Sequence, residues 1–114
     1  MASTTIRVLD RATLREGDTL SLDQAPDLGD YGELHLILTI HQGTEGDAPA
    51  LIFRHAPVAE DDAWLDFPEP IRVSLLRTDR LWFSPARHTR YLGWSPAGHL
   101  DGEVIVTLDV VART

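Results

Sequence analysis

The sequence has no cysteine, no lysine and no stretch with the periodicity of an amphipathic helix. Without cysteine, the chain has no disulfide scaffold, no thiolate metal site and no cysteine nucleophile. No apolar run approaches the roughly 20 residues that a membrane-spanning helix needs. The opening residues, MASTTIRVLD, lack a basic region followed by an apolar run. We therefore expect no signal peptide and a cytoplasmic or virion-like location.

What the chain does contain is the composition of one ordinary globular domain. It has 114 residues, of which 43% are hydrophobic and 25% are charged. That length is close to the commonest domain size, and one core of that size can be stable without disulfides or metal ions. The sequence shows no internal repeat and no linker, so we expect residues 1–114 to form a single domain.

Alternation of apolar and polar residues recurs along the chain and predicts an all-β fold. It is clearest at 33–42, where Leu34, Leu36, Leu38 and Ile40 share one face, and at 103–111, where one face is apolar throughout. Shorter strands are expected at 5–9, 19–22, 50–55, 71–75, 80–84 and 90–94. The acidic, proline-containing stretch 56–70 is expected to be irregular. Short strands between turn signals predict a single jelly-roll-like antiparallel β-sandwich of about seven or eight strands.

Charge is unevenly distributed along the chain. The net charge is −8, which disfavours nucleic acid and anionic membranes as partners. Residues 1–70 carry four Arg and fourteen acids, whereas residues 71–114 carry six Arg and four acids. An acidic first part and an Arg-bearing second part would suit head-to-tail contact between identical copies.

None of the polar clusters matches a known pattern for catalysis or for metal binding. His35 and His41 share a sheet face but lie roughly 20 Å apart at about 3.3 Å per residue, too far to share a metal ion. The acidic stretch 60–69 has no glycine with which to wrap a calcium ion. Nucleophile-elbow, phosphate-loop and zinc-protease motifs are missing. We therefore expect no metal, no cofactor and no enzymatic activity.

Aromatic residues and arginines concentrate in the second half of the chain and supply the candidate binding residues. Core packing is one interpretation of the aromatic residues, because large rings dominate burial. The other is a binding surface, since protein interfaces are enriched in Trp, Tyr and Arg. Under that hypothesis the binding residues are Trp64, Trp82, Arg87, Arg90 and Trp94.

Two segments carry a resemblance to known domains. The stretch RHTRYLGWSPAGHLDGEVIVTLDVVAR (87–113) and the strand YGELHLILTI (31–40) resemble parts of small jelly-roll sandwiches. Those domains include phage virion and assembly proteins and discoidin-like or galactose-binding-like modules. The resemblance implies a structural or assembly module that self-associates or docks on a larger, phage-like particle. The alternative is a carbohydrate-binding module that holds a glycan on exposed aromatic rings.

Overall fold

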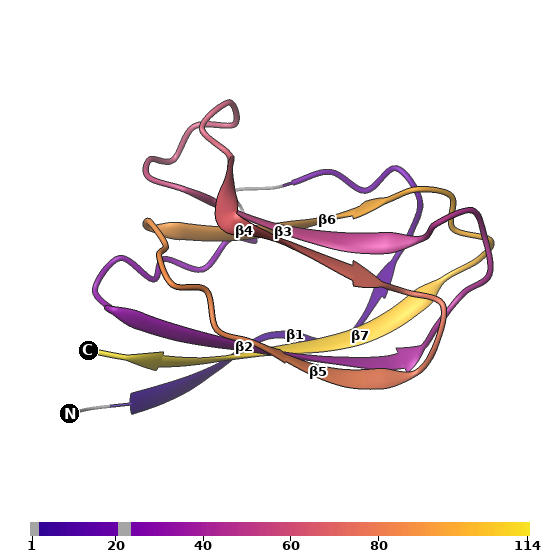
Figure 1. The fold of residues 1–114 in the computed structure, drawn as a ribbon, viewed down its shortest axis with the longest axis horizontal. Coiled ribbons are helices and arrows are strands. Elements are labelled where there is room, and N and C mark those ends of the chain that lie inside the picture. The colour runs from indigo at the N-terminus through magenta and orange to yellow at the C-terminus, as the bar shows by residue number, and fades with distance from the viewer. Residues whose placement is uncertain (1–2, 21–23) are drawn as a thin grey trace.

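The computed structural model describes residues 3–20 and 24–114, which fold into two antiparallel sheets packed face to face (Figure 1). The four-stranded sheet has the order β1 (Ser3–Leu14), β7 (Val104–Arg113), β2 (Glu33–Gln42), β5 (Asp79–Phe83). The three-stranded sheet has the order β4 (Leu65–Ser74), β3 (Ala50–Ala56), β6 (Tyr91–Ala97). The described residues contain no helix, and the predicted all-β sandwich is confirmed.

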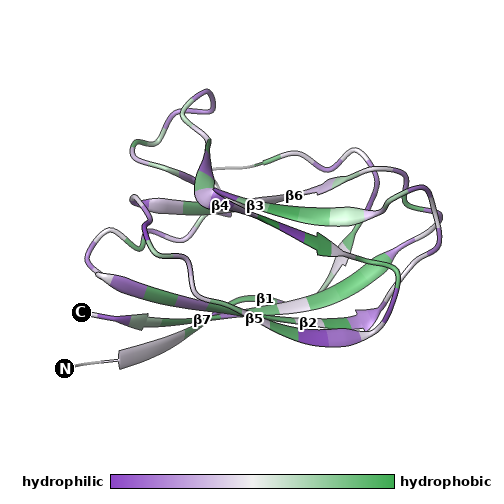
Figure 2. Ribbon diagram, viewed as in Figure 1, coloured by the Kyte–Doolittle hydropathy of each residue, from purple (hydrophilic) through white to green (hydrophobic). Residues whose placement is uncertain are grey.

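The core lies between the two sheets, and the alternating pattern of β2 and β7 builds most of it. Leu34, Leu36, Leu38 and Ile40 are all at most 2% exposed, as the alternation predicts. Strand β7 is central, because it pairs with β1 on one side and with β2 on the other. The strongly hydrophobic residues accordingly concentrate on the strands rather than on the loops (Figure 2).

Strand β1 is longer than its alternation predicts. The expected strand 5–9 extends to Ser3–Leu14, with irregularities in its register against β7 between Arg7 and Leu9 and between Leu9 and Ala12. Arg11 adopts a positive φ of 46° at the second irregularity. Each bulge shifts which side chains face inward, so the period of two disappears from the sequence beyond Leu9.

The irregular structure expected at 56–70 is wrong for its second half. Strand β4 starts at Leu65 and includes Pro68 and Pro70. Proline fits here because β4 pairs only with β3, and the register shifts between Phe53 and Arg54. A proline at a free sheet edge or in a bulge removes no ladder hydrogen bond.

The remaining strands lie close to their predicted positions. The stretches expected at 50–55, 80–84 and 90–94 correspond to β3, β5 and β6, each with small shifts at the ends. Of the strand expected at 19–22, Thr19 and Leu20 are not in a strand, and the rest lies outside the described residues. The connection from β1 to β2 instead reaches β6 at its first residue, where Asp27 bridges Tyr91.

Candidate interaction site

The structure does not gather the five predicted binding residues into one site. Trp94 lies on β6 and packs in the core, where it is only 8% exposed. Trp64 and Trp82 line two different surface hollows. Arg87 and Arg90 follow in the exposed connection between β5 and β6. Burial of Trp94 agrees with the core interpretation of the aromatic residues rather than with the binding one.

Trp64 packs as a cover over β6. A Cβ atom placed on Gly93 would lie 2.6 Å from the ring of Trp64 and 2.8 Å from Leu20, so the indole rests directly against the strand backbone. The indole Nε1 is buried and has no hydrogen-bond partner among the described residues. Glycine is required at this position because any side chain would displace the Trp64 ring.

Arg90 fastens the β1–β2 connection to the edge of β6. Its guanidinium lies 2.8 Å from the carboxylate of Asp27 and 5.6 Å from the ring centroid of Tyr91. The hydrogen bond from Arg90, together with one from the backbone of Gly29, lowers the pKa of the Asp27 carboxyl. Arg90 is thus engaged within its own chain, whereas Arg87 is exposed and pairs with no described carboxylate.

Trp82 is the predicted residue that the structure presents most openly. It lies on β5 and is 69% exposed, on the opposite side of the strand from Leu81 and Phe83, which pack on the core. In the register of β2 and β5 it lies opposite Ile37, one row from His35. The indole Nε1–H donates to Nδ1 of His35 over 3.2 Å, and the two rings meet edge to face at 5.6 Å.

The ring of His35 is itself held on both sides. An indole N–H can only donate, so Nδ1 of His35 is an acceptor and the remaining ring proton sits on Nε2. Nε2 lies 3.0 Å from Glu33, and Nδ1 lies 2.7 Å from the hydroxyl of Ser84. Glu33, His35 and Ser84 were missed from the sequence, because only the pairing of β2 with β5 brings them together. The hydrogen bonds that link Glu33 to His35 and His35 to Trp82 orient the exposed indole.

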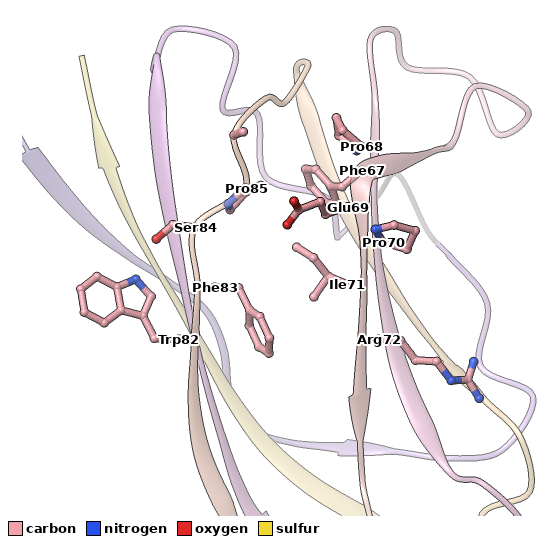
Figure 3. Close-up of a pocket in the computed structure, with 11 residues that line it drawn as sticks. Phe67, Pro68, Glu69, Pro70, Ile71, Arg72, Trp82, Phe83, Ser84 and Pro85 are labelled. Atoms are coloured by element: carbon pink, nitrogen blue, oxygen red, sulfur yellow. The ribbon is translucent and has the colours of Figure 1, made fainter.

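A groove opens beside Trp82 between the free edges of β4 and β5. It has a volume of about 450 Å³. Phe67 and Ile71 from β4 point across it toward Phe83 from β5, and Trp82 projects from the other side of its strand (Figure 3). Of its polar residues, Glu69 points its carboxylate into the groove, whereas the side chains of Arg72 and Ser84 point away from it (Figure 3). The groove therefore offers an apolar floor with few polar groups at its rim.

Positive charge near the groove comes from arginines without an ion-pair partner. Four exposed arginines of residues 72–87 pair with no carboxylate in the described part of the chain: Arg72, Arg77, Arg80 and Arg87. Strands β4 and β5 also carry three acids, Asp66, Glu69 and Asp79, of which Asp66 pairs with Arg54. Of the four arginines, only Arg72 lines the groove.

Three of the four sheet edges are guarded against pairing with another strand. Strand β1 has two bulges, and β4 has two prolines along its edge. Strand β6 is covered by residues 26–28, whose Leu28 N–H donates to the carbonyl of Arg90 over 2.7 Å. Strand β5 pairs with β2 in an unbroken register and has no proline. Its free edge has only the charges of Asp79 and Arg80 to discourage pairing.

The nearest approach to a catalytic arrangement is a histidine and a threonine in the interior. Nδ1 of His55 lies 2.7 Å from the hydroxyl of Thr89, and the imidazole stacks on Phe67 at 4.6 Å. Burial lowers the pKa of His55, partly offset by a hydrogen bond to the backbone of Asp66. The hollow that His55 and Thr89 line together has essentially no free volume. The contact holds the β5–β6 connection against β3.

Other kinds of site find little support in the described structure. Within residues 3–20 and 24–114, no three His, Asp or Glu side chains converge so that they could hold a metal ion. The same residues include no helix long and apolar enough to cross a membrane. Comparisons with protein-family models, with curated proteins and with solved structures found no match to this chain. The β5 edge and its groove are therefore the leading candidate site.

Proposed function

We propose that this chain is a non-catalytic structural module that self-associates through the β4–β5 side of its sandwich, as a subunit of a larger, phage-like particle. The observation that carries the proposal is Trp82, an exposed indole hydrogen-bonded to His35 beside the one sheet edge among the described strands that has no bulge, proline or covering segment. Rigid aromatic anchors dominate the energetics of protein interfaces because they bury a large area at little cost in entropy.

The strand order supports a jelly-roll form of the sandwich. A jelly roll has about eight strands in two packed sheets. Seven strands are described here, four in one sheet and three in the other. At the β6 edge of the smaller sheet, Leu92 N–H donates to the carbonyl of Pro26. The described residues 26–28 therefore lie where an eighth strand would complete two sheets of equal size.

Ion pairs within the chain weaken the case for a head-to-tail contact between copies. Two arginines of the second part already pair with carboxylates of the first part in the same chain, Arg90 with Asp27 and Arg113 with Glu33. Those charges contribute little to binding another copy.

The second candidate is carbohydrate binding at Trp82. The N–H edge of the indole meets His35, which leaves the ring faces open, and Glu69 could bond sugar hydroxyls in the adjoining groove. Aromatic faces stack well on sugar rings, since both are apolar plates rimmed by polar groups. A glycan would use the same indole that self-association buries.

Sedimentation velocity across a concentration series separates the two functions. We expect the wild-type chain to associate and Trp82→Ala to associate clearly more weakly. Val58→Ala is the matched control, because Val58 is also exposed but lies in the β3–β4 loop. A monomer at every concentration, with Trp82 fluorescence that shifts on adding a glycan, would replace assembly by carbohydrate binding.

A further inference from the structure

We propose that β5 pairs antiparallel with β5 of a second copy, about a two-fold axis at Leu81, to join two four-stranded sheets into one. This inference rests on the proposed function and specifies its interface. Its starting point is the contrast among the four edges: two bulges, two prolines and a covering segment guard three of them, and β5 has none of these. An unguarded edge with an exposed aromatic residue is a template for a further strand.

The faces of β5 restrict the register of such a pair. Leu81 and Phe83 face the core, whereas Arg80 and Trp82 face outward. In a continuous sheet, residues directly opposite one another share a face, so inward residues must meet inward residues. The two-fold axis must then pass through a residue position and not between two positions. Axes at Asp79 or Phe83 would pair only one residue of β5 within the strand, which leaves axes at Arg80, Leu81 and Trp82.

Chemistry chooses among these three registers. An axis at Arg80 places two guanidinium groups directly opposite each other, which is repulsive. An axis at Trp82 places Asp79 opposite Pro85, which lies beyond the strand and has no N–H. An axis at Leu81 pairs all five residues of β5 with one another.

The Leu81 register also places Arg80 of each copy beside Trp82 of the other. The guanidinium would then lie against the open face of an indole that His35 already holds in place. The two-fold axis forms this contact twice. On the inner face, the two Leu81 side chains meet at the axis. A sequence that complements itself in this way favours a second copy over an unrelated strand.

Single-cysteine variants test the register, because the chain has no cysteine of its own. Residues directly opposite in an antiparallel pair have Cα atoms about 4.5–5.5 Å apart, within the range that a disulfide spans. Oxidised glutathione is the oxidant, and the product is measured on a non-reducing gel. We expect Leu81→Cys to form a covalent dimer. Thr5→Cys on the β1 edge is the control that should not. Efficient dimerisation of Trp82→Cys in place of Leu81→Cys would overturn the register.

Charge exchange provides a second test that needs no cysteine. Arg80→Glu removes the cation from the indole, and Trp82→Lys places an ammonium group opposite Arg80 of the other copy. Each single variant should weaken association by roughly tenfold. The double variant R80E/W82K places the introduced carboxylate opposite the introduced ammonium group across the axis, so it should recover most of the loss. A double variant as weak as the two single losses combined contradicts the proposed pairing.

The two proposals fail in different ways. A wild-type chain that stays monomeric at every concentration removes self-association, and the β5 pairing with it. A chain that associates, but shows neither the Leu81→Cys dimer nor recovery in the double variant, keeps the assembly function and rejects this interface. Circular dichroism of every variant shows whether the sandwich is intact.

Discussion

The backbone N–H of Thr89 donates to Nδ1 of His55 over 3.1 Å, within the closed interior beside β3. His55 is 7% exposed, and burial lowers the pKa of its imidazole below the ordinary value of 6.5. The contact requires Nδ1 to be without a proton, so the neutral ring belongs to the folded state. The Thr89 contact therefore links protonation of His55 to folding.

Stability should fall as the pH drops below about 6.5. In that window the unfolded chain binds a proton at His55 that the folded chain does not, so the free energy of unfolding decreases with decreasing pH. Urea melts between about pH 8 and pH 5 measure the slope. His55→Gln keeps a polar group and does not titrate, so its slope should be shallower. Asp27 affects stability in a more acidic range. Its pKa is lowered from the usual 3.8, so the stability that its carboxylate contributes is lost only below about that pH. Equal slopes for both proteins would remove His55 as the cause.

Removing the ring of His35 should weaken association without unfolding the domain. His35→Ala removes the hydrogen-bond acceptor of the Trp82 indole. Binding must then also order the indole, and this lowers the affinity. We expect a weaker dimer by sedimentation and faster motion of Trp82 by fluorescence anisotropy. His99→Ala is the control, because His99 bonds Glu16 instead of an interface group. Unchanged anisotropy in His35→Ala would show that the hydrogen bond does not restrain the indole.

Leu36→Ala should cost roughly 2–5 kcal/mol of folding free energy. Leu36 is fully buried on β2, between Phe83 of β5 and Val110 of β7 in the two adjoining registers. Ile37→Ala, next along the strand but on its outer face, is the paired variant and should cost clearly less. Urea melts give both values. A loss below about 1 kcal/mol for Leu36→Ala would contradict its place in the core.

Truncation after Gly102 should abolish folding. It removes β7, the strand that lies between β1 and β2. The buried residues lost with it are Val104, Val106, Leu108 and Val110. Without β7, strand β1 has no partner in the sheet. Circular dichroism and thermal melting of the truncated chain test this expectation. A truncated chain that still melts cooperatively would mean that β7 is dispensable.

Salt should strengthen self-association through β5. Each copy carries a charge of −8, so two copies repel each other. Screening at physiological ionic strength acts over about 8 Å, and added salt reduces that repulsion. A head-to-tail contact between acidic and Arg-bearing regions would respond in the opposite direction. Sedimentation across a salt series shows whether added salt strengthens or weakens association. Arg87→Glu is the informative reversal for the head-to-tail contact, because Arg90 is already paired with Asp27.

The alternation of residues determined the strands that have one buried face. At 33–42 and 103–111 every second residue is apolar, and burial of that face is the largest free-energy term available to the chain. The same local rule failed where tertiary context decided. The bulges of β1 hid its second half, and the free edge of β4 accommodated Pro68 and Pro70 in a strand.

The site was beyond the reach of the sequence for a related reason. The sequence made Trp64, Trp82 and Trp94 candidates for core packing or for binding. An aromatic residue suits both roles, and only the tertiary packing shows which one each residue has. Pairing of β2 with β5 set Trp82 outward on His35, whereas β6 turned Trp94 into the core and the ring of Trp64 came to rest on Gly93. Which edges stay unpaired is likewise a property of sheet order, which depends on contacts between residues far apart in the chain.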